Sequence, residues 1–243
     1  MLKFALMQLR WEYRKDESTA VQRFRYRDSG LQHEMAFNAE GEMVLHLIAE
    51  TPVSVAADTA FQGVDLSVEV PYVLLPEVFR HADHPGLSGP LSKVSVEGGY
   101  TVAFEGSNPI PTALPLYTVA YEQSKGKNHY VLIHVTGKRV TVAAFSDQKP
   151  LLLNTFPAGN EAEALYFALG PFKRAGIDMA YVEVAVLSDS AAQAPLLQLF
   201  GRFLEDVKPC PVSLPYEVGQ YPPHADISLL LFTLSQCGLP AEP

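Results

Sequence analysis

Apolar and polar residues alternate along much of the chain, and clusters of turn residues interrupt the alternation at short intervals. A period of two is typical of half-buried β-strands, because successive side chains then point to opposite faces of a sheet. Asp, Asn, Ser and Gly stand where tight turns need them, so we expect the strands to form hairpins. The predicted strands are 21–27, 31–37 and 43–48 in the first half of the chain, and 130–135, 139–145 and 151–156 in the second.

A helical period replaces the alternation after the last of these strands. Asn160 is a good N-cap residue, and Glu163 three residues later completes a capping box. Apolar residues between Leu165 and Phe172 supply one face, and Gly176 is expected to end the helix. Pro171 lies inside this segment and is expected to kink or split the helix.

The rest of the second half predicts one more strand and two more helices. A buried strand over 180–187 ends at Ser188-Asp189-Ser190. A helix follows, with Pro195 in its first turn and Phe203 among its apolar residues. The last helix is predicted over 227–236, with Asp226 as its N-cap.

Residues 50–122 show a less regular pattern. It predicts a strand at 64–70, an extended segment turning into a short helix at 72–80, and a hairpin formed by 94–96 and 100–104. The polar segment 122–128 is the candidate link between two halves of similar size. The elements therefore predict an α/β fold with mixed sheets, divided into domains at 1–122 and 123–243.

The composition is that of a globular protein with ample apolar material for a core, since 48% of the 243 residues are hydrophobic and 19% are charged. The 19 prolines gather between the predicted elements, which supports two β-rich halves. Two cysteines are too few for a disulfide framework. No apolar stretch approaches the ~20 residues that span a bilayer, and no signal peptide is visible. We therefore expect a cytoplasmic protein with no membrane span.

Charge is unevenly distributed along the chain. Residues 1–27 carry seven basic and three acidic side chains, a local net charge of +4, which leaves −13 for the remainder of a chain whose net charge is −9. Arg23, Arg25 and Arg27 alternate with aromatic residues, so they would share one face of a strand. This face could touch nucleic acid, but phosphate binding needs a net positive field. A half-buried strand with its arginine stems on the surface is the simpler reading, and a nucleic-acid partner is not expected.

The familiar catalytic and cofactor motifs are absent from the sequence. It contains no P-loop, no G-x-G-x-x-G, no H-E-x-x-H, no C-x-x-C and no G-x-S-x-G. His81, Asp83 and His84 form the one local cluster of metal-ligating residues, and we read it as an exposed loop, because zinc needs a further rigid ligand. Cys210 and Cys237 are read as small, partly buried thiols.

Asp189 has two readings. It ends a predicted central strand and precedes a helix, which is where α/β proteins place their ligands. An N-capping role explains it equally well.

Three segments resemble a known family. They are Tyr72–Phe79 (YVLLPEVF), the strand pair over 129–145, and Leu152–Phe156 (LLNTF) followed by Glu163–Phe167 (EALYF). With the order of elements, they make the chain from about residue 20 onward similar to an uncharacterised Bacteroidetes family of unknown function with an actin-like ATPase fold. That fold belongs to the actin, sugar kinase and Hsp70 superfamily. The resemblance implies two ribonuclease H-like lobes that repeat a βββαβα plan.

The resemblance also implies where a nucleotide would bind. In the superfamily one β-hairpin in each half clamps the phosphates through backbone N–H groups, an Asp organises Mg²⁺, and a Gly pair after a later strand accommodates the adenosine. On this sequence the first hairpin carries Asp28 and Gly30, the second carries Thr136 and Gly137, and the adenosine position carries Asp189.

Two of these three loops depart from the superfamily pattern. His134 stands where the superfamily has Asp, Thr136 stands where it has Gly, and Gly137 is displaced by one position. Asp189 would bring a carboxylate near a polyanionic nucleotide, which like-charge repulsion disfavours. The resemblance therefore predicts degenerate phosphate loops.

These observations favour a non-catalytic protein that acts as an interaction or scaffold module, with no cofactor, an unidentified protein partner and a possible homodimer. The resemblance supports this reading, since the superfamily includes platforms for type IV pilus and type II secretion machinery. The alternative is a nucleotide-dependent enzyme, an ATPase or small-molecule kinase, that uses ATP with Mg²⁺. RNA binding through the arginine face ranks last.

Overall fold

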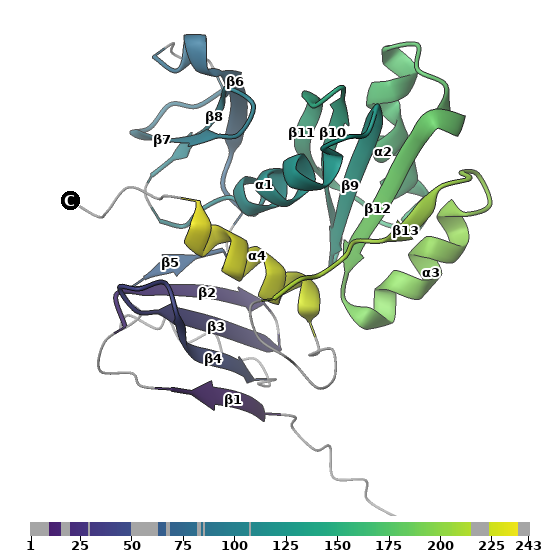
Figure 1. The fold of residues 1–243 in the computed structure, drawn as a ribbon. Helices are drawn as coiled ribbons and strands as arrows, with labels where there is room; N and C mark the ends of the chain where they lie inside the picture. Colours follow the sequence, from purple (N-terminus) through teal and green to yellow (C-terminus); the bar gives the residue numbers. More distant parts are fainter. Residues whose placement is uncertain are drawn as a thin grey trace, which may run out of the picture.

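The computed structural model describes residues 10–15, 20–28, 30–49, 63–66, 69–81, 84, 86–106, 108–214 and 224–237. These residues form three β-sheets and four α-helices (Figure 1). The first sheet contains β1 (Arg10–Arg14), β2 (Gln22–Asp28), β3 (Leu31–Phe37), β4 (Met43–Ala49) and β5 (Val64–Asp65). A small second sheet contains β6 (Tyr72–Pro76), β7 (Leu91–Val96) and β8 (Tyr100–Glu105). The third sheet contains β9 (His129–Thr136), β10 (Arg139–Ser146), β11 (Lys149–Pro157), β12 (Val182–Ser188) and β13 (Val207–Pro209).

Four strands of the first sheet and four of the third share one topology, and the fifth strand of each lies at a different edge. The third has the order β11-β10-β9-β12-β13, in which β9 to β11 form an antiparallel meander and β12 runs parallel to β9. The first has the order β1-β4-β3-β2-β5, and here too an antiparallel meander, β2 to β4, has its first strand parallel to a later one, β5. The repeated plan predicted from the sequence is thus complete in the second half. In the first half the segment between β4 and β5 lies outside the described residues.

The third sheet is buried on both faces, because adjacent residues of its strands pack into two different cores. On β9, Leu132 belongs to a central core, while Val131 and Ile133 pack against the helices on the outer face. Those helices are α2 (Glu161–Arg174) and α3 (Ser190–Phe200). The buried strands are consequently rich in Val, Ile and Leu rather than strictly alternating.

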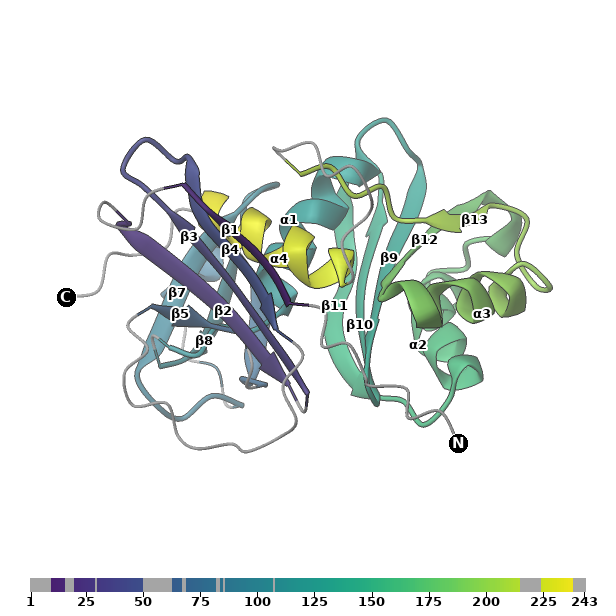
Figure 2. The same cartoon turned by 90° about the horizontal axis from the view of Figure 1, so that it is seen from below.

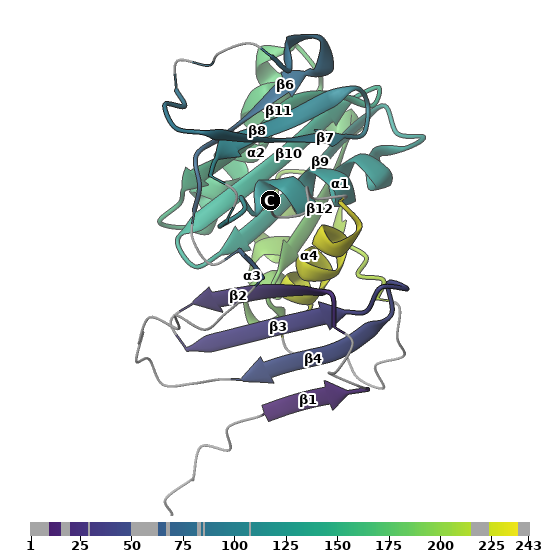
Figure 3. The same cartoon turned by 90° about the vertical axis from the view of Figure 1, so that its left-hand side faces the viewer.

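The helices α1 (Ala113–Ser124) and α4 (Ala225–Gln236) fill the space between the first and third sheets (Figures 1 and 2). The helix α1 packs on β9, β10 and β11, α4 packs on β2 and β3, and the two helices contact each other. Their buried residues form one continuous core with the inner faces of all three sheets. The C-terminal helix therefore covers the sheet formed by the N-terminal strands, as the side view in Figure 3 shows.

The helix α1 is missing from the sequence-based prediction. Pro115 lies in the first turn of α1, where the missing backbone N–H has no intrahelical partner to lose. Because α1 extends to Ser124, the predicted link over 122–128 is wrong in its first part and reduces to a short turn before β9.

Two other prolines also lie inside helices. Pro171 was expected to kink or split α2; the helix is not split and runs from Glu161 to Arg174, with the proline in its last turn. Pro195 is the sixth residue of α3 rather than a first-turn residue. Phe203 lies beyond α3 and is exposed, so its assignment to the apolar face of the helix is wrong.

Most other predicted elements are confirmed within two or three residues. The meanders, the hairpin of β7 and β8, and the extended segment that turns into a 3-10 helix at Glu77–Phe79 are all present. The predicted strand at 64–70 is shorter, since β5 covers only Val64–Asp65. Another 3-10 helix, Met179–Tyr181, takes the first residues of the strand predicted at 180–187. No helix among the described residues is long and apolar enough to cross a membrane.

The central core makes a direct prediction for α4. Leu230 is fully buried between the sheets, so Leu230→Ala removes its side chain and leaves a cavity. We expect a loss of about 2–5 kcal/mol in the free energy of unfolding, measured by urea denaturation. Val78→Ala is the matched control, because Val78 is 85% exposed and should change stability by less than about 0.5 kcal/mol. Equal effects of the two substitutions would contradict the placement of α4.

Candidate functional site

The candidate site lies where the β9–β10 hairpin meets the first turn of α4. His134 is near the end of β9, and its Nε2 lies 3.3 Å from Oδ2 of Asp226 in α4. The hydroxyl Oγ1 of Thr136 lies 2.8 Å from the same Nε2. Two side chains, Thr136 from β9 itself and Asp226 from α4, 92 residues from His134, therefore converge on one imidazole nitrogen.

The His134–Asp226 contact is almost fully withdrawn from solvent. Each of the two residues is only 3% exposed, and Oδ1 of Asp226 is a buried oxygen without a hydrogen-bond partner among the described residues. The first turn of α4 suits a carboxyl group there, because the helix macrodipole is positive at its N-terminus. Removing one partner of such a buried contact leaves the other polar group without a hydrogen bond, which lowers the free energy of unfolding.

Asp226 does not cap α4 as predicted. The N-cap is His224, which has left-handed backbone angles and makes no side-chain capping bond. Asp226 is one residue inside the helix, and it turns to His134 on the third sheet instead of to its own backbone. Its role in the site was missed, and the only sequence signal was a lone carboxylate at the start of an otherwise apolar helix.

A small cavity lies beside His134, and a groove of about 420 Å³ between the small sheet and the third sheet adjoins it. A cavity of about 30 Å³ is lined by His134 and Thr136 together with residues of β2, β6, β10 and β11, among them Tyr26, Tyr72 and Thr155. The hydroxyl of Tyr72 bonds Oγ1 of Thr155 at 3.1 Å and links the small sheet to the third sheet across this space. A cavity of this volume holds about one or two water molecules, whereas ligand pockets span about 300–1,000 Å³.

A larger groove opens beyond the same hairpin, on the outer side of the third sheet. It has a volume of about 480 Å³ and is lined by Gly137, Asp189 and the first turns of α2 and α3. Asp189 caps α3, since its Oδ1 accepts a hydrogen bond from the backbone N–H of Ala192 at 2.9 Å. Asn160 caps α2 in the same way by accepting from the N–H of Glu163 at 3.0 Å. Both helix N-termini are thus already occupied by side chains of the chain itself.

The predicted site residues do not form one site, because they lie in different parts of the structure. Gly137 and Asp189 meet in the outer groove, while Thr136 faces the small cavity with His134. Gly30 lies in the β2–β3 turn with φ of 99°, a backbone conformation that favours glycine, and it lines neither space. Asp28 ends β2, and its side chain lies outside the described residues, as does Ser29.

The other candidates of the sequence are dispersed. No group of three His, Cys, Asp or Glu residues able to hold a metal ion occurs in the described part of the chain; Asp83 lies outside it. Cys210 and Cys237 are free thiols, and burial raises the pKa of Cys210 to about 11. Arg23 pairs with Glu34 at 3.1 Å and Arg25 pairs with Asp65 at 2.5 Å, so two of the three alternating arginines face carboxylates of the chain.

The chain is similar in sequence to one protein family and in fold to several solved structures. Residues 103–207 match a family described as "Protein of unknown function (DUF3822)". A crystal structure from Bacteroides thetaiotaomicron, described as a protein with actin-like ATPase fold and unknown function, superposes with a TM-score of 0.62 at 12% identity. The match covers 86% of this chain and 95% of that one. The chain has the actin-like ATPase fold.

A second structure with this fold is the PilM-PilN type IV pilus biogenesis complex, which matches with a TM-score of 0.52 at 11% identity. The match covers 88% of this chain and 98% of that one. A search of curated proteins finds no match. The resemblance predicted from the sequence, to a family of unknown function with the actin-like fold, is confirmed. Identities this low show the fold and leave function to be argued from the site.

The His134–Asp226 contact can be tested by a double-mutant cycle. We expect His134→Ala and Asp226→Ala to destabilise the protein, and the double variant to lose less than the sum of the two. The expected coupling free energy is about 0.5–3 kcal/mol, measured by urea denaturation. Thr118→Ala combined with Asp226→Ala serves as a control, because Thr118 lies on α1 and bonds to Leu114 and Cys237 instead. A coupling of zero for His134 and Asp226 would contradict a shared contact.

Proposed function

We propose that this protein is an interaction or scaffold module with the actin-like ATPase fold, and that it carries out no phosphoryl transfer. The observation that carries the proposal is the buried contact of His134, Thr136 and Asp226, next to a cavity of only about 30 Å³. In the superfamily pattern that the sequence resembles, His134 stands where the phosphate-binding hairpin carries an Asp. Phosphoryl transfer depends on preorganised positive groups and a metal around the phosphates, and an imidazole shielded by a buried carboxyl group offers neither.

The turn that follows β6 in the small sheet supplies the contact surface for a partner. Val78 and Phe79 are 85% and 57% exposed in the 3-10 helix that follows β6. Their position is fixed, because the carboxylate of Glu77 accepts hydrogen bonds from Thr101 and Ser95, and the N–H of Glu77 bonds Gly99. Exposed apolar side chains that lie next to each other on a fixed turn offer apolar area that a partner could bury. A protein of this fold also occurs in a complex, the PilM-PilN assembly.

The outer groove supports a second candidate function, nucleotide or nucleoside binding. Gly137 and Asp189, which the superfamily pattern assigns to the phosphates and the adenosine, line one groove of about 480 Å³. That volume is adequate for a small ligand.

The division into lobes at residue 122, the homodimer and the degenerate state of the phosphate loops stay predictions.

A thermal-shift measurement with Mg²⁺-ATP separates the two functions. A ligand at 100 times its Kd stabilises a protein by about 2.7 kcal/mol, which is readily visible as a rise in Tm. We expect no shift at millimolar Mg²⁺-ATP. A clear shift that disappears in Ala192→Phe, which fills the outer groove, would establish the second function, whereas a shift that persists in this variant would contradict the first. Ala39→Phe, at an exposed turn between β3 and β4, is the control for the added ring.

The interaction surface is tested by reversing its polarity. We expect Val78→Glu with Phe79→Glu to abolish binding of a partner captured by the wild-type chain and then purified. The Tm should be unchanged, because both residues are exposed. Tyr166→Glu with Tyr181→Glu changes two exposed aromatic residues elsewhere and should retain binding. If the first double variant binds as tightly as wild type, the small sheet is not the contact surface.

A further inference from the structure

The N-terminal half of α4 is held from both sides by histidines. On the third sheet His134 contacts Asp226, and on the first sheet Nε2 of His33 lies 3.3 Å from Oγ of Ser228. Asp226 and Ser228 are two positions apart in the first turns of α4. These turns therefore join β9 of the third sheet to β3 of the first through polar contacts of buried residues.

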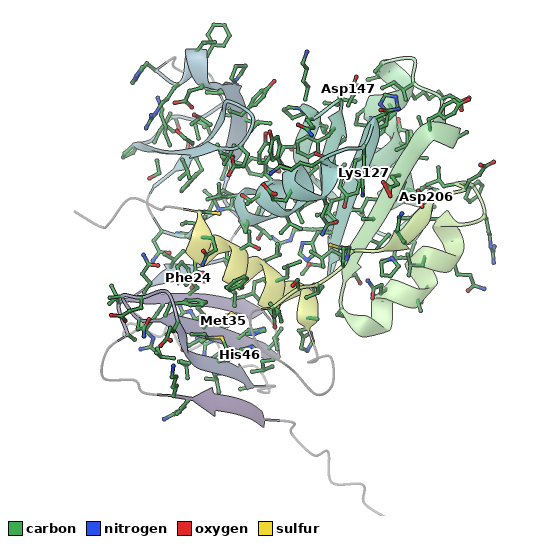
Figure 4. All side chains as sticks on the ribbon, in the orientation of Figure 1. Phe24, Met35, His46, Lys127, Asp147 and Asp206 are labelled. Atoms are coloured by element: carbon green, nitrogen blue, oxygen red, sulfur yellow. The ribbon has the colours of Figure 1, made fainter. Side chains whose placement is uncertain are left out.

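A second buried histidine, His46, lies beside His33 on the first sheet. Nε2 of His33 lies 2.7 Å from Nε2 of His46 on β4, and the two rings stack at a centroid distance of 4.9 Å with an interplanar angle of 14°. Both imidazoles are fully buried on the face of the sheet that α4 covers; Figure 4 labels His46 beside Met35 and Phe24 beneath this helix. One nitrogen must donate and the other must accept, so the contact exists only while at least one imidazole is neutral.

The surroundings of the pair disfavour added positive charge. In strand register Tyr26 of β2 lies opposite His33. From α4 the facing polar and titratable groups are His224, Asp226 and Ser228, and the positive end of the helix dipole points the same way. Asp226 is the one acid in this set, and it contacts His134 on the other side.

The same features keep the two histidines neutral. Burial, with smaller contributions from His46 and His224, holds the pKa of His33 well below its ordinary value. Burial lowers the pKa of His46 to about 4. Nδ1 of His33 is buried and has no hydrogen-bond partner among the described residues, so a second proton on this ring would find no acceptor.

We propose that the first half of α4 is a proton-released latch: protonation of the buried His33–His46 pair detaches it from the first sheet while the third sheet stays folded. The charged pair breaks the contact between the two Nε2 atoms, and two neighbouring cations beneath the positive end of a helix repel each other and that end. Release of α4 exposes the inner face of the first sheet and removes Asp226 from His134. A fall in pH that protonates the histidine pair therefore separates the two large sheets.

The direction of the pH dependence follows from the linkage relation. The released state has histidines with ordinary pKa values near 6.5 and therefore binds more protons than the latched state. The latch is at full strength above about pH 6.5 and weakens as the pH falls from there towards 4. For each proton that release takes up, the equilibrium constant for release should increase about tenfold when the pH falls by one unit.

Hydrogen exchange followed by mass spectrometry on the full chain tests the latch. At a series of pH values, with exchange corrected for its intrinsic rate, we expect peptides from α4 and β3 to lose protection between pH 6.5 and 4. Peptides from β9 and β10 should stay protected over the same range. In His33→Gln with His46→Gln, which stays neutral, the acid-dependent loss in α4 should disappear, whereas His81→Gln, at an exposed position, should behave as wild type.

Two results would overturn the proposal. One is loss of protection in α4, β9 and β10 together at a single pH, which is global acid unfolding. The other is an unchanged acid response in the double glutamine variant. Should that variant fail to fold, an NMR titration of the wild-type histidines decides the question. The latch requires two imidazoles that stay neutral until α4 amides lose protection, and it is wrong if all histidines titrate near pH 6.5 while α4 stays protected.

Discussion

Burial of α1 and α4 between two β-sheets is the constraint on which the rest of this structure depends. Each large sheet presents an apolar inner face, and neither the strands nor the small sheet can cover it alone. The two helices form the layer between the sheets, and their buried residues join the inner faces of all three sheets in one central core. Removing α4 would expose the inner face of the first sheet, at a cost that scales with the apolar area returned to water.

The same layer determines what the region between the sheets can do. The helix α4 brings Asp226 and Ser228 into the region between the two large sheets. Buried polar groups must find partners, and those available are the histidines of the facing strands. Under the proposed function, the contacts that complete the core also close this region to ligands. Binding then belongs to surfaces outside the central layer, such as the exposed turn at Val78 and Phe79 or the groove at Asp189.

Local chemistry made much of the fold predictable from the sequence. Turn residues and alternating Val and Ile defined both meanders, and Asn160 with Glu163 defined the start of α2. The helix α1 escaped prediction, because Pro109, Pro111 and Pro115 suggested irregular chain, although the last of them fits a first helical turn. The candidate site was predictable only in part. Gly137 and Asp189, which the resemblance assigns to one site, do line one groove, whereas the contact of Asp226 with His134 joins residues 92 positions apart and has no local signature.

The central claim is that α4 fixes the two large sheets in a closed arrangement that leaves no room for a nucleotide between them. The most direct measurement is the distance distribution between paramagnetic labels at Gln22 on β2 and Gln148 in the β10–β11 turn, both exposed, by pulsed electron paramagnetic resonance. We predict a single narrow distribution that is the same with and without millimolar Mg²⁺-ATP. A second population, or a shift in the distance when Mg²⁺-ATP is added, would show that the sheets open around a nucleotide and would contradict the account.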